Sequence, residues 1–149
     1  MNDRLPSALA YAGALPFVFC ALAPLIWGSD PLPLVGPADR AATLYGLAIA
    51  SFLAGSHWGL YLEHGPAAPG NLFLASNAVV LTAFFAVLLA SSGVSAAVLM
   101  LTFAYLLYVD VTLHQAALTP RSYLTMRWRV TLIVLIALAM VAWQPASGA

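Results

Sequence analysis

Lysine is absent from this 149-residue sequence, and charged residues of any kind make up only 7% of it. Five arginines balance five acidic residues, so no basic surface is available to collect nucleic-acid phosphates. The single cysteine, Cys20, excludes an intrachain disulfide and a cysteine-rich metal site. Hydrophobic residues make up 63% of the chain and the mean hydropathy is +0.95, whereas soluble domains carry about 25% charged residues. The composition predicts an integral membrane protein that contacts the lipid bilayer and does not bind nucleic acid.

Apolar runs separated by Gly, Pro and charged residues predict an all-α bundle of five transmembrane helices, forming a single domain over residues 1–149. The first run also has features of a secretory signal, but Pro24 directly follows the small residues 21–23, so we expect it to be retained as a helix. Asp39 is the expected N-cap of the second helix, and Pro120 the first-turn proline of the fifth. The predicted helices cover about residues 8–27, 40–62, 71–90, 94–114 and 120–143.

The arginines predict the orientation of this bundle. Five spans place the termini on opposite sides, with four arginines on the N-terminal side and Arg40 alone on the other. Because positively charged loops face the cytoplasm, we expect a cytoplasmic N-terminus and a C-terminus outside. Trp58 and Trp128 near one interface, and Trp27 and Trp143 near the other, agree with this placement. A first helix this close to the N-terminus leaves no room for an Arg-rich presequence, so the expected location is a bacterial inner (cytoplasmic) membrane.

Polar side chains gather at one depth, in the cytoplasmic half of the predicted bundle. Placing polar and ionisable groups inside a membrane costs free energy, so their presence there suggests a functional site. We therefore predict a ligand-binding polar layer there, and we assign no catalytic residue, metal or cofactor. Its residues come from the second to fifth helices: His57, Trp58, Ser76, Asn77, Asp110, His114 and Arg127.

The ionisable members of this layer allow more than one interpretation. Asp110 and His114 lie four residues apart on one helical face, where a carboxylate can orient an imidazole. Alternatively, Asp110 pairs with an arginine of the fifth helix, because a buried Asp in lipid needs a cation. Arg127 and Arg129 lie about 200° apart on a helix, and we expect Arg127 to be the one that faces inward. His57 has no carboxylate within one turn, so it is either a ligand-binding residue or a hydrogen-bonded packing residue.

The second predicted helix carries two rows of small residues, which predicts that it packs centrally between its neighbours. By helical angle, His57 lies on the side of Gly46 and not on that of Gly55. Tyrosines of the predicted helices, Tyr123 among them, are interpreted as interfacial or packing aromatics. The two rows are Ser51, Gly55 and Gly59, and Gly46, Ala50 and Ala54.

Two motifs stand out along the chain. Residues 51–59 read Ser-Phe-Leu-x-Gly-x-His-Trp-Gly, and residues 120–129 read Pro-x-x-Tyr-x-x-x-Arg-x-Arg. Together with Leu5-Pro6, residues 12–17, Tyr45-Gly46 and Tyr108-x-Asp110, they make the chain resemble the transmembrane protein 69-like family over nearly its whole length. The resemblance implies a small helical membrane protein of bacterial inner membranes or mitochondria, without an established biochemical activity.

The polar layer supports three hypotheses about function. The favoured one is a non-enzymatic protein that binds a small amphipathic ligand, such as a quinone, haem or lipid, or a partner in a respiratory complex. The second is an enzyme on a lipid-soluble substrate, with Asp110 and His114 as acid–base pair; the sequence lacks an acidic cluster for magnesium and a nucleophile elbow. The third is a transporter or channel subunit, although no inverted repeat is present. The small-residue face of the second helix would pair two copies in a homodimer.

Overall fold

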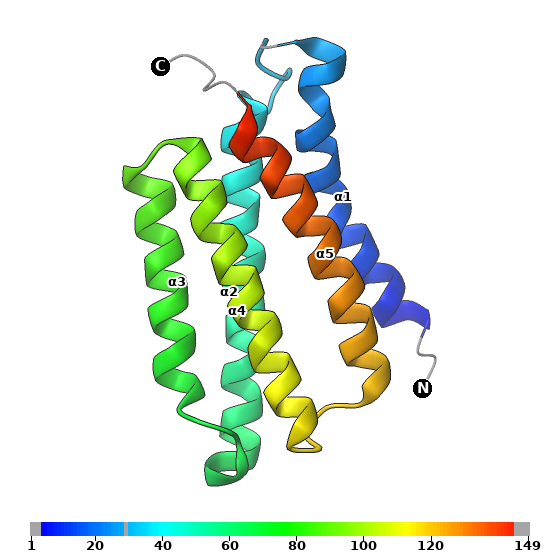
Figure 1. Ribbon diagram of the computed structural model, residues 1–149, viewed down its shortest axis with the longest axis vertical. Coiled ribbons are helices and arrows are strands. Elements are labelled where there is room, and N and C mark those ends of the chain that lie inside the picture. The colour runs from blue at the N-terminus through cyan, green and yellow to red at the C-terminus, as the bar shows by residue number, and fades with distance from the viewer. Residues whose placement is uncertain (1–3, 29, 145–149) are drawn as a thin grey trace.

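The computed structural model describes residues 4–28 and 30–144 and is all-α over this part of the chain, as predicted (Figure 1). One isolated antiparallel bridge joins Leu32 and Gly36 in the first loop. The helices are α1 (Arg4–Trp27), α2 (Ala38–His64), α3 (Leu72–Leu89), α4 (Ser92–Gln115) and α5 (Arg121–Trp143), with a short 3₁₀ turn, η1 (Gly65–Ala67), after α2.

The helix ends differ from the predicted ones where prolines are involved. α1 begins four residues earlier than expected, because Pro6 fits a first helical turn, where its missing N–H costs no hydrogen bond. The prediction of Asp39 as an N-cap is wrong: Pro37 occupies that position, and Asp39 lies in the first turn of α2, where the helix dipole favours a carboxylate. Pro120 is likewise the N-cap residue of α5 and not its first residue, since its backbone is extended.

α2 is the central helix, as its small residues predicted. It contacts each of the other four helices, whereas α1 contacts α2 and α5, and α3 contacts α2 and α4. α1 and α3 therefore lie on opposite sides of the bundle (Figure 1). The loops α3–α4 and α4–α5 are short, so these three helices run antiparallel to their chain neighbours.

One of the two rows on α2 faces the core and the other does not. Gly46, Ala50, Ala54 and His57 are all buried, whereas Gly55 is exposed. A Cβ at position 46 would lie 2.9 Å from Leu99 Cδ1, so glycine permits α2 to pack closely against α4. His57 thus lies on the Gly46 side, as helical angle predicted, and points into the bundle.

Four helices are long and apolar enough to cross a membrane: α1 from Leu5, α3, α4 and α5. α2 is not among them, although it has 27 residues, because Asp39, Arg40 and His57 lower its hydropathy. The structure therefore supports a multi-pass helical membrane protein with at least these four apolar helices.

Candidate functional site

Asp110 is the centre of a buried polar network that joins three helices. Its Oδ1 accepts hydrogen bonds from His57 Nε2 at 2.9 Å and from Tyr123 OH at 3.3 Å. Its Oδ2 accepts from Arg127 Nε at 2.6 Å. The exposed fractions are 1% for Asp110, 3% for His57 and 5% for Arg127. The network is thus removed from the surface and links α2, α4 and α5.

The hairpin between α4 and α5 brings Asp110 of α4 close to Tyr123 and Arg127 of α5. Because the connection spans only residues 116–120, the last turns of α4 lie beside the first turns of α5. His114 fixes the hairpin: its Nδ1 donates to Thr119 O at 2.7 Å. Tyr123 and Arg127 are four residues apart on α5, so both side chains reach Asp110 from one face.

These contacts decide between the interpretations offered for Asp110. The carboxylate pairs with the Arg127 guanidinium, which a buried Asp in an apolar setting requires. Arg127 is the inward arginine, as expected, and Arg129 is exposed. No hydrogen bond joins Asp110 to His114 among the described residues, because His114 bonds the backbone instead. Both oxygens of Asp110 are already occupied, so the group is poorly placed to act as a free base.

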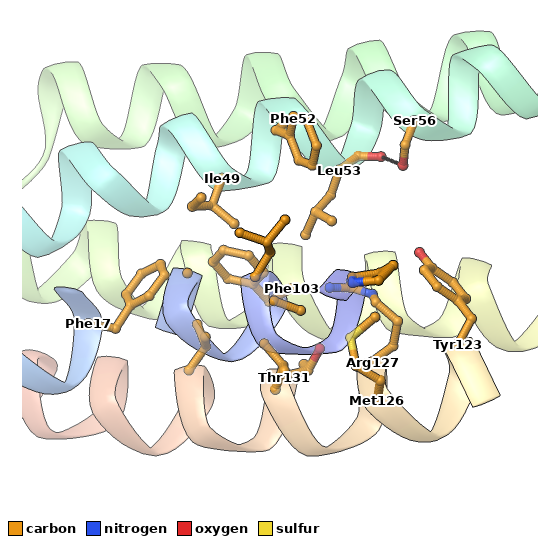
Figure 2. Close-up of a pocket in the computed structure, with 16 residues that line it drawn as sticks. Phe17, Ile49, Phe52, Leu53, Ser56, Phe103, Tyr123, Met126, Arg127 and Thr131 are labelled. Atoms are coloured by element: carbon orange, nitrogen blue, oxygen red, sulfur yellow. Dashed lines mark hydrogen bonds between the residues drawn. The ribbon is translucent and has the colours of Figure 1, made fainter. Parts of the chain in front are cut away.

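A cavity of about 460 Å³ lies next to this network, between α1, α2 and α5. Its walls are almost entirely hydrocarbon, from side chains such as Phe17, Ile49 and Phe103. Figure 2 shows Phe17 at one end of the cavity and Arg127 with Tyr123 at the other. The cavity therefore has an apolar body and a polar end that is part of the Asp110 network.

Two polar atoms of the cavity residues have no partner within the described part of the chain. Arg127 Nη2 and Thr131 Oγ1 are buried and make no hydrogen bond. Two hydroxyls of the cavity residues are satisfied: Tyr123 donates to Asp110, and Ser56 donates to Leu53 O at 2.6 Å (Figure 2). Both unpartnered atoms are enclosed by the protein, so they belong to the packing around the cavity and do not face its open space.

Sequence reasoning missed two residues of the site, Tyr123 and Thr131. The signal was present in their spacing, because Tyr123, Arg127 and Thr131 recur every four residues and so share one face of α5. Tyrosine alone is a common packing residue, and threonine is common in apolar helices. The row can be recognised as part of a polar site only when Arg127 is known to face inward.

Three predicted site residues lie elsewhere, in a small groove of about 170 Å³ between α2 and α3. Ser76 is buried and donates to Leu72 O at 2.6 Å. Asn77 is exposed and donates to Phe73 O at 2.8 Å, and the Trp58 ring packs edge-on against Phe73. The expected single layer is thus divided between two places, because α3 lies on the far side of α2 from the cavity. A ligand-binding role for these three residues stays a prediction.

Metal binding finds no support in the described part of the chain, where no three His, Cys, Asp or Glu side chains lie close enough to share an ion. Cys20 is buried in the core and unpaired by any disulfide. The polar network can therefore be described as an ion pair with two further donors, adjoining a cavity.

A family model described as "Protein of unknown function (DUF3429)" matches residues 2–143. The chain belongs to the DUF3429 family. Searches of curated proteins and of solved structures found no match. The family description names no activity and does not carry the transmembrane protein 69-like name, so that resemblance stays a prediction. The matched range nevertheless covers the five α-helices, including every residue of the Asp110 network.

Proposed function

We propose that this DUF3429 chain is a non-enzymatic membrane protein that holds a small amphipathic molecule in the cavity between α1, α2 and α5. The observation that carries the proposal is the cavity itself, which has almost entirely hydrocarbon walls and one end formed by Tyr123 and Arg127 of the Asp110 network. A bound molecule with an apolar body and a polar end would match both parts of this cavity.

The dimensions of the cavity fit this proposal. Sites for small molecules have volumes of roughly 300–1,000 Å³ and combine mostly apolar walls with a few polar groups that orient the ligand. The cavity of about 460 Å³ falls inside this range. Its polar end is held in place, because Asp110 accepts hydrogen bonds from Arg127 Nε and Tyr123 OH.

Among the ligand types expected from the sequence, these contacts favour a quinone or a lipid over haem. Haem iron needs an axial ligand, commonly a histidine nitrogen. His57 Nε2 already bonds Asp110 Oδ1 at 2.9 Å, so this nitrogen is engaged. The enzyme alternative loses its acid–base pair for a similar reason, since His114 and Asp110 each bond other groups.

We further propose that α2 also crosses the membrane, giving five spans, a cytoplasmic N-terminus and a C-terminus outside, in a bacterial inner membrane. At 27 residues α2 is roughly 40 Å long, enough for a hydrocarbon core of about 30 Å. His57, in the last two turns of α2, is buried against Asp110 and away from lipid. The transmembrane protein 69-like resemblance agrees with this topology.

Co-purification tests the binding function. The protein is extracted mildly from its own membrane, and bound small molecules are quantified by mass spectrometry for the wild type and for Ala10→Phe, which adds a ring to the cavity wall. Ala48→Phe is the matched control, because Ala48 is exposed on α2 and does not line the cavity. We expect a near-stoichiometric molecule in the wild type and Ala48→Phe and its loss in Ala10→Phe. Equal recovery of the same lipids from all three proteins would contradict the proposal.

A further inference from the structure

The cavity between α1, α2 and α5 is elongated along the helices. It is lined by side chains from residues 6–17 of α1, 49–56 of α2 and 123–134 of α5, and Figure 2 shows Phe17 and Tyr123 at its opposite ends. At the rise of an α-helix, the lined stretch of α1 or α5 is roughly 16 Å long. This length is close to that of one leaflet, since the hydrocarbon core of a bilayer is about 30 Å thick.

The cavity opens to the surface of the bundle between α1 and α2. Its exposed lining residues all come from these two helices, and we call them the mouth: Pro6, Leu9, Phe52 and Ser56. Leu9 and Phe52 are exposed by 64% and 73%. Every lining residue from α4 and α5 is buried or half-buried. The open side of the cavity therefore lies at the mouth.

The end of the cavity at Phe17 is closed. Phe17 and Phe103 are exposed by only 1% and 2%, and their rings meet edge-on with centroids 5.8 Å apart. Tyr45 joins α1 to α2 beside this end, because its OH donates to Gly13 O at 3.0 Å and its ring packs against Phe17. The space next to Phe17 is thus reached from the mouth by a path along the helices.

The mouth faces the hydrocarbon of the cytoplasmic leaflet in the proposed topology. α1 begins at Arg4 on that side, which places Leu9 roughly 8 Å along the helix. Leu9 and Phe52 are pure hydrocarbon, and the Ser56 hydroxyl is satisfied by Leu53 O at 2.6 Å. A mouth of this composition admits a hydrocarbon chain from the bilayer, whereas a hydrated solute would lose its water there without compensation.

The polarity of the cavity matches that of a lipid in this leaflet. Ser56 and Tyr123 line the end nearest the cytoplasm, and Phe17 and Val134 line the end toward the bilayer centre. A lipid of the cytoplasmic leaflet likewise has its polar group at the cytoplasmic interface and its chain toward the bilayer centre. The charge of Arg127 is balanced by Asp110, so the polar end does not require an anionic group.

Resting on the proposed binding function, we infer that the cavity holds one hydrocarbon chain of a cytoplasmic-leaflet lipid, which enters sideways through the mouth and ends near Phe17. The polar group that carries the chain lies at the end of the cavity beside Ser56 and Tyr123. Two membrane sources supply such a chain: the acyl chain of a glycerophospholipid and the isoprenoid chain of a quinone.

Photo-cross-linking from within the chain tests this inference. The protein is placed in phosphatidylcholine nanodiscs that contain a small share of phosphatidylcholine with a diazirine near the methyl end of one acyl chain. After illumination, labelled residues are mapped by mass spectrometry. We expect label on Phe17 and Phe103, which are too deeply buried for lipid on the outer surface to reach, and on exposed Phe84 of α3. Label on Phe84 with none on Phe17 or Phe103 would overturn the inference.

A second probe tests the direction of the chain. With the diazirine beside the ester instead of near the methyl end, we expect the label on Phe17 and Phe103 to be lost. Equal labelling of Phe17 by both probes would contradict the orientation. Addition of an isoprenoid quinone identifies the source, because loss of the Phe17 label would assign the cavity to the quinone chain and an unchanged label would assign it to the acyl chain.

Two variants of α1 test the route of entry. Leu9→Trp narrows the mouth, so we expect the label on Phe17 and Phe103 to be lost while that on Phe84 remains. Leu15→Trp is the matched control, because Leu15 is also 64% exposed but does not line the cavity, and its labelling should equal that of the wild type. Equal labelling of Phe17 in both variants would overturn entry through the mouth.

Failure of the inference and failure of the binding function give different results. If Phe17 and Phe103 stay unlabelled but a co-purified molecule is lost in Ala10→Phe, the lipid chain is wrong and the cavity remains a binding site for a more compact ligand. If they stay unlabelled and the wild type and Ala10→Phe carry the same lipids, both proposals are wrong.

Discussion

At the scale of single residues, Asp110 organises the site. It is the acceptor for donors from two other helices, His57 of α2 and Arg127 and Tyr123 of α5. Both members of the ion pair are at least nine-tenths buried. Removing one partner of such a pair leaves the other as an uncompensated buried charge, which is more costly than the loss of the contact itself.

Asp110→Asn should therefore destabilise the protein strongly. The substitution keeps the size of the side chain but leaves Arg127 without a counter-charge, so we expect the free energy of unfolding to fall by about 3–5 kcal/mol. Reversible unfolding in mixed micelles measures this change. Asp30→Asn is the control, because Asp30 is exposed in the first loop and should change stability by less than about 0.5 kcal/mol. Similar stability of the two variants would show that the ion pair is not a structural requirement.

At the scale of helices, the two faces of α2 differ in what they contact. The face with Gly46 packs closely against Leu99 of α4 and Phe17 of α1, and it brings His57 to Asp110. The face with Gly55 and Gly59 is open to its surroundings, because a methyl group added at either glycine would meet no atom within 4 Å. Close approach at Gly46 thus sets the distance between α2 and α4, on which the polar network depends.

A pair of glycine substitutions separates these two faces. Gly46→Ala would place a methyl group 2.9 Å from Leu99 Cδ1, and Leu99 is fully buried, so we expect a loss of about 1–3 kcal/mol. Gly55→Ala meets no neighbour and improves helix propensity, so its stability should be equal or higher. Unfolding of both variants under the same conditions provides the comparison. Equal losses would mean that the α2–α4 distance is not limited at Gly46.

Much of this arrangement could be predicted from the sequence. Apolar runs and the breakers between them located the five α-helices, and the angle between residues 127 and 129 predicted that only one of the two arginines faces inward. The need of a buried Asp for a cation predicted the Asp110–Arg127 pair as one alternative. These inferences depend on local periodicity or on the free-energy cost of burying an unpaired charge, and both can be judged from the sequence.

Other features depend on helix packing and were not accessible in this way. His57 and Asp110 are 53 residues apart, and nothing local shows that their helices cross at that depth. The predicted depth in the membrane placed Ser76 and Asn77 in the same polar layer as Asp110, but α3 lies on the opposite side of α2 from the cavity. The cavity depends on how far α1 stands from α2 and α5 near Ala10, a spacing that no sequence pattern encodes.

At the scale of the whole molecule, the number of spans decides the topology. With α2 crossing, five spans place the termini on opposite sides; with only the four most apolar helices crossing, both termini would share one side. α2 contacts every other helix, and its buried face carries the histidine that joins the network, so the bundle is built around it.

Reporter fusions at the C-terminus test this topology. Alkaline phosphatase fused after the last residue should be active and green fluorescent protein dark, because only the former matures outside the cytoplasm. The same reporters at the N-terminus give the opposite pattern if five helices cross. A fluorescent C-terminal fusion with an inactive phosphatase would contradict the proposed orientation. If the N-terminal green fluorescent protein were fluorescent as well, the number of spans would be even.

The most direct test of the central claim is a lipidic-phase crystal structure of the protein, purified without stripping its native lipids. We predict elongated density in the cavity between α1, α2 and α5, with its polar end beside Tyr123 and Arg127. A cavity that is empty or closed by repacked side chains would contradict the account, and the Asp110 network would then only hold the helices together.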